Sequence, residues 1–290
     1  VFNNIECFFK KMNPEQYCHE KVVNSGSNFT GAFALLSNDR RLSIEAIYAF
    51  CREIDDIVDE CSDMALAKVK LSWWKNEVEK NFDSSSNHPV LRALSSPIKK
   101  YSLQKTDFLE IIDGVAMDTN HEPFKDWNDL DIYCDKVAGA VGRLSSRVFG
   151  GVDDQIIQYA SILGRACQYT NIIRDIAEDL RKNRCYLPIT LLKKYEINSS
   201  QQIFENNLKF TNMCSEMAKI NHGLYNLAFK ILPKEKYKEQ RAGIVMGVVY
   251  RTLLRKIEHS NFNVKERKVS LHPFKKFWSA WYASWGSIPS

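Results

Sequence analysis

The chain has 290 residues, of which 44% are hydrophobic and 26% charged, a composition typical of a globular protein with a large core. A net charge of +5 is modest for this length and gives no indication of nucleic-acid binding. No stretch approaches the roughly 20 consecutive apolar residues of a spanning helix, and residues 1–11 lack the layout of a signal peptide. We therefore predict a single domain over residues 1–290, soluble or peripheral, in the cytoplasm.

Cysteine usage indicates a reducing environment. The 8 cysteines are scattered, with no Cys-x-x-Cys pair and no accompanying His-x-x-x-His. Neither a zinc site nor a dense disulfide framework has that spacing, so we expect reduced thiols in the core.

Apolar residues recur three and four positions apart along most of the chain, which is the period of a helix with one buried face. This pattern covers residues 42–58, 66–78, 108–117, 130–149, 156–180, 203–232 and 242–257. All 8 prolines lie between these segments or at their edges, and strict two-residue alternation is nowhere sustained. The sequence therefore predicts an all-α fold.

Two local features add further expectations. Residues 83–89 contain a serine-rich run and are expected to form a solvated loop between helices. Gly139, Gly142 and Gly164 fall inside helical patterns, where each glycine costs up to about 1 kcal/mol relative to alanine. We expect these glycines to allow close helix approach or to leave room for a ligand.

An acidic motif lies in the stretch Tyr-Ala-Phe-Cys-Arg-Glu-Ile-Asp-Asp-Ile-Val-Asp-Glu at residues 48–60. Asp55 and Asp59 are four residues apart, so on a helix their side chains point the same way from successive turns. Like charges at this spacing repel by roughly a few tenths of a kcal/mol. A cation is expected to offset this repulsion.

A second acidic motif follows in residues 169–179. Asn171, Asp175 and Asp179 are spaced four and four, which gives a stripe of oxygen ligands along one helix face. Two facing stripes of this kind would hold a hard cation. Magnesium, with manganese as an alternative, prefers a few carboxylates plus water and phosphate oxygens, so a diphosphate is the natural bridging ligand.

Each acidic motif taken alone also fits an ordinary solvated helix face. Both lie in otherwise apolar helices, and each has an arginine within one turn, Arg52 or Arg174, which favours a ligand site. A di-iron carboxylate bundle is disfavoured because it needs Glu-x-x-His on two helices, and the nearest match is a single stretch, 118–121. Asp113 and Asp118 are expected either to add charge to the cavity or to lie at a solvated helix end.

At these residues the sequence resembles the squalene/phytoene synthase family. The resemblance spans about residues 24–281 and rests on three stretches in order, 47–59, 133–142 and 171–179, the last followed by Arg-Cys-Tyr-Leu-Pro at 184–188. Within the family, the stretch Ser-Gly-Ser-Asn-Phe at 25–29 and the wording of these motifs are most similar to the bacterial presqualene diphosphate synthases of the hopanoid pathway. Asn28 and Asn183 depart from the family pattern, which leaves the roles of those two positions open.

The resemblance implies an isoprenoid synthase fold in which the acidic motifs face each other across a central cavity. It implies metal ligation, directly or through water, by Asp55, Asp59, Asn171, Asp175 and Asp179. It implies diphosphate binding by Arg52, Arg174 and Arg184, where the planar guanidinium suits phosphate oxygens, with Asn171 also near substrate. Tyr48 and Tyr133 match family tyrosines that line the reaction centre, where Arg52 and Arg174 also act.

The implied reaction is a magnesium-dependent, head-to-head condensation of two farnesyl diphosphates to presqualene diphosphate. The allylic cation must be kept from water, and Phe29, Phe33 and Phe50 are expected to wall the cavity with Tyr48 and Tyr133. Each of these aromatic residues taken singly also fits a plain core position. NADPH is not expected, because the resemblance is to single-step enzymes.

Other activities stay open at this stage. They are a phytoene or dehydrosqualene synthase, a two-step NADPH-dependent squalene synthase, and a non-enzymatic, prenyl-lipid-binding regulatory paralogue. A terpene cyclase or chain-elongating enzyme is disfavoured by the stretch 133–142, and the intact acids and arginines disfavour the regulatory paralogue.

The C-terminal segment combines basic residues with an aromatic helix face at Phe274, Trp278, Trp281 and Trp285. Cations and tryptophans together suit a peripheral contact at the inner membrane face. An ordinary helix that covers the core explains the pattern equally well.

Overall fold

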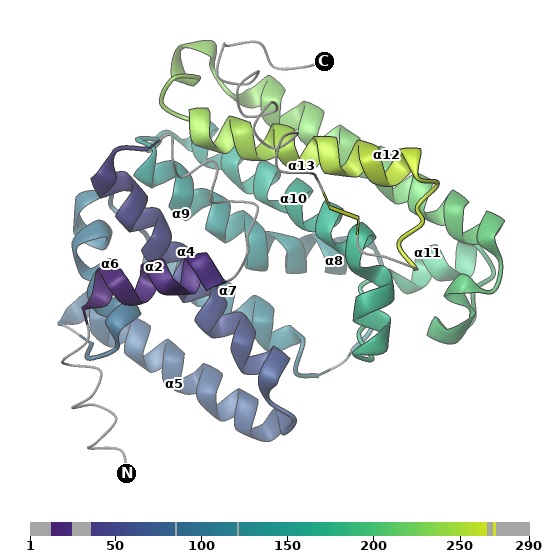
Figure 1. The fold of residues 1–290 in the computed structure, drawn as a ribbon, viewed down its shortest axis with the longest axis horizontal. Helices are drawn as coiled ribbons and strands as arrows, with labels where there is room; N and C mark the ends of the chain where they lie inside the picture. Colours follow the sequence, from purple (N-terminus) through teal and green to yellow (C-terminus); the bar gives the residue numbers. More distant parts are fainter. Residues whose placement is uncertain (1–12, 25–35, 85, 121, 266–268, 271–290) are drawn as a thin grey trace.

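The computed structural model describes residues 13–24, 36–84, 86–120, 122–265 and 269–270. Every regular element in these ranges is a helix, and Figure 1 shows how they are arranged. The α-helices are α2 (Pro14–Asn24), α4 (Asn38–Glu60), α5 (Met64–Asp83), α6 (Pro89–Lys100), α7 (Lys105–Met117), α8 (Trp127–Cys134), α9 (Ala140–Val148), α10 (Asp154–Arg181), α11 (Ile189–Lys194), α12 (Asn207–Ile231) and α13 (Arg241–His259). A π-helix, η1 (Asp135–Gly139), and two 3-10 turns, η2 (Ser200–Phe204) and η3 (Lys234–Lys236), complete the set.

Side-chain caps fix where several helices begin. The Asp63 carboxylate accepts hydrogen bonds from the backbone N–H groups of Ala65 and Leu66, at 2.8 and 3.3 Å, and starts α5. Asn206 caps the first turn of α12 in the same way. The prediction of one helix over residues 203–232 is therefore wrong at its start, because the cap separates α12 from the preceding 3-10 turn.

Residues 83–100 differ most from expectation. Pro97 lies inside α6, whereas all prolines were expected outside helices or at their edges. The expected solvated loop is also wrong for Ser86 and His88, which are buried. Asn81 accepts a hydrogen bond from the Ser86 backbone at 3.2 Å, and the ring of His88 packs against that of Trp74 with centroids 4.5 Å apart. These contacts pack the segment between α5 and α6 against α5.

Two apolar clusters form the interior, one that includes α4 and one that includes α10 (Figure 1). The first cluster is built from α2, α4, α5, α6, α7 and α9. The second is built from α8 and α10 to α13. Within the described residues, none of the helices is both long and apolar enough to cross a lipid bilayer. All seven described cysteines are free thiols.

The predicted helix over 130–149 is interrupted by the π-helix η1, which separates α8 from α9. Close packing of this segment on α10 depends on glycine. An added Cβ at Gly142 would collide with the backbone carbonyl of Ala160, and one at Gly164 with the carbonyl of Ala138. The expectation of close helix approach is confirmed at these two positions.

Candidate active site

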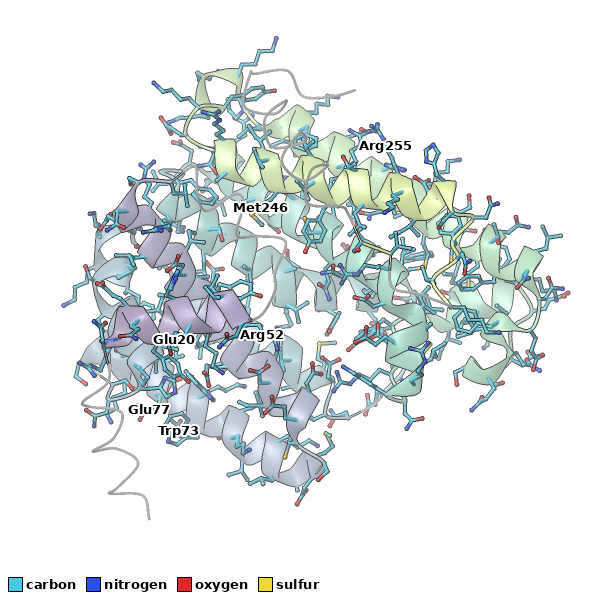
Figure 2. The ribbon with its side chains drawn as sticks, in the orientation of Figure 1. Glu20, Arg52, Trp73, Glu77, Met246 and Arg255 are labelled. Atoms are coloured by element: carbon cyan, nitrogen blue, oxygen red, sulfur yellow. The ribbon has the colours of Figure 1, made fainter. Side chains whose placement is uncertain are left out.

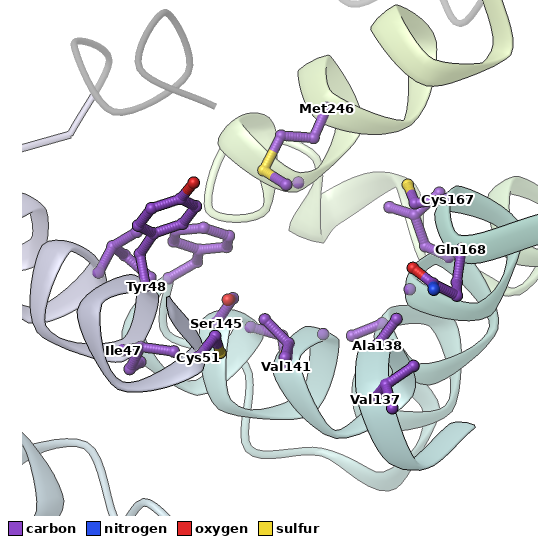
Figure 3. A pocket seen from close by; sticks show the side chains of 18 of the residues that line it. Ile47, Tyr48, Cys51, Val137, Ala138, Val141, Ser145, Cys167, Gln168 and Met246 are labelled. Atoms are coloured by element: carbon purple, nitrogen blue, oxygen red, sulfur yellow. The ribbon is translucent and has the colours of Figure 1, made fainter. Parts of the chain in front are cut away.

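A cavity of about 320 Å³ lies between the two apolar clusters, with walls from α4, η1, α9, α10 and α13. Figure 3 shows Tyr48 of α4 on one side and Cys167 and Gln168 of α10 on the other. Met246 of α13 lies at one wall and Val141 of α9 at the opposite one. Most of the lining is apolar, so the cavity suits a hydrocarbon chain.

The polar part of the lining comes from both acidic motifs. Arg52 and Asp55 belong to α4, and Asn171 belongs to α10. The Asn171 side-chain nitrogen donates to Gln168 Oε1 at 3.2 Å. Its Oδ1 is buried and accepts no hydrogen bond from the described residues. An unsatisfied buried oxygen is an acceptor that a cation or a hydrogen-bond donor of a ligand would satisfy.

Two carboxyl groups of the acidic motifs have raised pKa values. Burial, with added repulsion from Asp59 and Asp118, raises the pKa of Asp55 to about 7, although Arg52 opposes the shift. Burial and the neighbouring Asp175 raise the pKa of Asp179 to about 7. Desolvation is the main cause of both shifts, and neighbouring carboxylates add to it. Buried acids with perturbed pKa values are typical of functional sites.

The three predicted arginines each pair with an acid. Arg52 pairs with Asp56, one turn along α4, and Arg174 pairs with the adjacent Asp175, with Nε to Oδ1 at 2.8 Å. Arg184 follows α10 and donates from Nη1 to Asp59 Oδ1 at 2.6 Å. Its Nη2 donates to the Val58 carbonyl at 3.0 Å, so the end of α10 is tied directly to the end of α4.

Asp118, at the end of α7, joins this group. Tyr186 and Tyr133 donate their hydroxyl protons to its two carboxylate oxygens, at 3.0 and 3.2 Å. The two tyrosine rings are stacked, with centroids 5.2 Å apart. Burial raises the pKa of Asp118 to about 6, while both tyrosines and Arg184 favour its ionised form. The expectation of a solvated helix end does not hold for this residue.

The predicted residues lie in different parts of the site. Tyr48, Arg52, Asp55 and Asn171 line the main cavity. Asp179 and Arg184 line a small cleft beside Tyr186, and Asp59 reaches this cleft through Arg184. Tyr133 is outside the cavity lining and contacts Asp118 instead.

One of the aromatic residues predicted to line the cavity, Phe50, does not do so. Phe50 is fully buried in the core against Trp74 and Phe108, with ring centroids 5.7 and 5.1 Å away, so its prediction as a wall was wrong. The aromatic side chains of the lining are Tyr48, Phe149 and Tyr159. The predicted Phe29 and Phe33 lie outside the described residues, as do the C-terminal tryptophans.

Sequence reasoning left Tyr186 without a role and Asp118 undecided. Tyr186 stands in the Arg-Cys-Tyr-Leu-Pro stretch, which was a usable signal. Asp118 lies just past the end of α7 and belongs to neither acidic stripe, so only its packing shows its place in the site.

The donor set fits a hard cation bound together with a ligand. The oxygens of Asp55, Asp59, Asn171, Asp175 and Asp179 are those that magnesium prefers. Among the residues described, no three acidic, histidine or cysteine side chains converge closely enough to hold a metal alone. Asp55 and Asn171, one residue from each stripe, line the same cavity.

Comparison with known proteins places the chain in a family. Residues 22–275 match the profile of squalene/phytoene synthases. Presqualene diphosphate synthases of Rhodopseudomonas palustris and Zymomonas mobilis are 31% and 33% identical, over 89% and 93% of this chain and 92% and 96% of theirs. A phytoene synthase of Mycobacterium tuberculosis is 29% identical, over 86% of this chain and 83% of its own.

The fold agrees with the sequence comparison. The crystal structure of a dehydrosqualene synthase superposes with a TM-score of 0.83 at 24% identity, covering 93% of this chain and 95% of that one. The all-α architecture is the isoprenoid synthase fold. The chain belongs to the squalene/phytoene synthase family, and it is an enzyme of the prenyltransferase type that acts on prenyl diphosphates.

Proposed function

We propose that this enzyme condenses two farnesyl diphosphates head to head to presqualene diphosphate, with release of one diphosphate. The observation that carries the proposal is the apolar cavity whose polar lining combines Arg52 and Asp55 of α4 with Asn171 of α10. A hydrocarbon cavity with oxygen and arginine groups beside it suits two prenyl diphosphates. The names of the Rhodopseudomonas palustris and Zymomonas mobilis relatives, which match over 89% and 93% of this chain, support presqualene diphosphate as the product.

We further propose that magnesium binds between the two acidic stripes and that manganese can replace it. When bound, the metal would supply positive charge to the departing diphosphate. Asp55 and Asp59 would ligate from α4, and Asn171, Asp175 and Asp179 from α10. The unpartnered Oδ1 of Asn171 and the raised pKa values of Asp55 and Asp179 support this assignment.

The arginines have to change partners when substrate binds. Arg52 and Arg174 are each neutralised by an aspartate in the substrate-free protein. A diphosphate offers more oxygens than one carboxylate and would draw both guanidinium groups toward it. Guanidinium groups beside the diphosphate would stabilise the negative charge that develops on it as the carbon–oxygen bond breaks.

The walls of the cavity would protect the cation. Val141, Leu163 and Met246 exclude water from it, and the ring of Tyr48 stands at the same wall. Of the two predicted tyrosines, only Tyr48 contacts the cavity, so we assign it the direct contact with the reacting carbons. Tyr133 would act indirectly, through the hydrogen bond that its hydroxyl donates to Asp118. The released diphosphate is the proposed acceptor of the proton lost when the cyclopropane closes.

The test is product analysis with purified protein, magnesium, and either farnesyl or geranylgeranyl diphosphate, with and without NADPH. Presqualene alcohol after phosphatase treatment, unchanged by NADPH, is the expected result. Squalene formed only with NADPH would show a two-step squalene synthase instead. Dehydrosqualene, or phytoene from geranylgeranyl diphosphate, would show a carotenoid enzyme, and the absence of any product would revive the regulatory paralogue.

A further inference from the structure

Large apolar side chains are exposed on one face of α5. Leu66, Val69 and Trp73 expose 46%, 65% and 44% of their surface. They are spaced three and four residues apart, so they form one stripe along the helix. The opposite face of the same helix carries its buried apolar residues, which are Ala67, Leu71, Trp74 and Val78. We call the exposed set the α5 stripe.

The α5 stripe lies in a cationic setting. Residues 64–76 contain three lysines and no acidic residue. Lys68 and Lys70 flank Val69, and both are exposed. Among the described residues, neither forms an ion pair within 4.0 Å, whereas Lys75 pairs with Asp113. Apolar side chains with a tryptophan among them and lysines beside them are complementary to an anionic lipid surface.

The position of the α5 stripe suits such a surface. Figure 2 shows Trp73 at the edge of the molecule, and α5 runs along that edge in Figure 1. Only three residues, 61–63, separate the start of α5 from the end of α4, where Asp59 lies. A surface that touches the first turns of α5 therefore lies close to the acidic end of α4.

We propose that α5 docks the enzyme on anionic membranes, with the α5 stripe entering the headgroup boundary and Lys68 and Lys70 near lipid phosphates. The reason for docking, a prenyl substrate and product that partition into lipid, rests on the proposed function. The docking itself rests only on the composition and exposure of α5. The two inferences can therefore fail independently.

The test is flotation of the full chain with vesicles of phosphatidylcholine, with and without phosphatidylglycerol. The unmodified protein is expected to float with anionic vesicles, less so at high salt. The double variant L66Q/V69E is expected to lower the partition coefficient about tenfold or more, since it removes two apolar contacts and adds a negative charge. Trp73 stays unchanged because its ring packs against Trp74 and His88.

A matched control is Leu208→Gln on α12, which is 71% exposed and outside the α5 stripe. It should float like the unmodified protein. Unmodified flotation of L66Q/V69E, or no flotation of the unmodified protein with anionic vesicles, would overturn the proposal. So would a gel-filtration shift from dimer to monomer in L66Q/V69E without any vesicle binding, because the α5 stripe would then join two copies of the chain.

The same variants separate this inference from the proposed function. Turnover of dissolved farnesyl diphosphate without vesicles should be unchanged in L66Q/V69E, because neither residue lines the cavity. A protein that binds vesicles through α5 but makes no presqualene diphosphate would refute the proposed function alone.

Discussion

Arg184 joins the two acidic motifs, because its guanidinium donates to the Asp59 carboxylate across 125 residues of sequence. Arg184→Gln should raise KM for farnesyl diphosphate about tenfold, since the charge near the phosphates is lost. Stability should fall by only about 1 kcal/mol, because Asp59 is partly exposed. Steady-state kinetics and urea unfolding measure the two effects.

The matched control for this variant is Lys182→Gln. Lys182 lies 3.9 Å from the same carboxylate, but its side chain is 45% exposed and, among the described residues, it donates no hydrogen bond to Asp59. Its KM should stay within about twofold of the unmodified enzyme. Equal effects of the two substitutions would mean that only net charge matters and that the Arg184 geometry does not.

Asp118 should matter for turnover although it is outside the cavity lining. Asp118→Asn leaves its shape intact but removes the charge that two tyrosine hydroxyls and Arg184 share. We expect kcat to fall about tenfold or more, with a smaller loss in Tyr186→Phe. The control is Asp113→Asn in α7, which loses its partly exposed pairs with Lys75 and Lys136. Normal kcat in Asp118→Asn would refute its role.

Gly142→Ala should destabilise the protein by about 1–3 kcal/mol, because the new methyl group collides with the Ala160 carbonyl of α10. Gly223→Ala is the matched control, since an added Cβ there meets no atom within 4 Å. As Gly223 lies inside α12, this control should stabilise by up to about 1 kcal/mol. Thermal melts that rank the two variants in the opposite order would contradict the close packing.

His88 should make stability depend on pH. Burial lowers its pKa to about 4 from an ordinary value near 6.5. Between these values the unfolded chain binds a proton that the folded chain does not, so stability falls as pH falls from 6.5 toward 4. The expected loss is about 1 kcal/mol for each pH unit in this window.

The variant that isolates this term is His88→Asn, because asparagine keeps a cap at the start of α6 but does not titrate. Urea unfolding at pH 7.5, 6.5 and 5.5 should give a flatter pH dependence for it than for the unmodified protein. Parallel pH curves would show that His88 is not buried in its neutral form.

Much of the fold followed from sequence because helical periodicity is a local signal. Residues 42–58 and 156–180 alternate apolar and polar groups at the spacing of one helix, and α4 and α10 form there. The α6 helix was missed because Pro97 is a helix breaker by rule, and its place in the helix depends on packing. The π-helix was missed because its wider turn leaves no mark on the apolar spacing.

The site residues also fall into two groups, those that local spacing predicts and those that only tertiary packing places. Asp55, Asp59, Asn171, Asp175 and Asp179 repeat at helical spacing and could be found by pattern, and Arg184 followed from the resemblance. Asp118 comes from a different helix than either motif, and Tyr133 donates to it from 15 residues away. Such contacts depend on tertiary packing, which no spacing rule contains. Phe50 was predicted to line the cavity but packs in the core against Phe108, and this too depends on tertiary packing.

The most direct test of the central claim, that both acidic stripes form one magnesium and diphosphate site, is the rate of presqualene diphosphate formation in Asp55→Asn and Asp175→Asn. Each variant should lose turnover by orders of magnitude while remaining folded without metal, and excess EDTA should abolish turnover of the unmodified enzyme. The control Glu60→Gln, at an exposed position of the same helix, should stay active. Wild-type rates in both aspartate variants, or full turnover in excess EDTA, would contradict the claim.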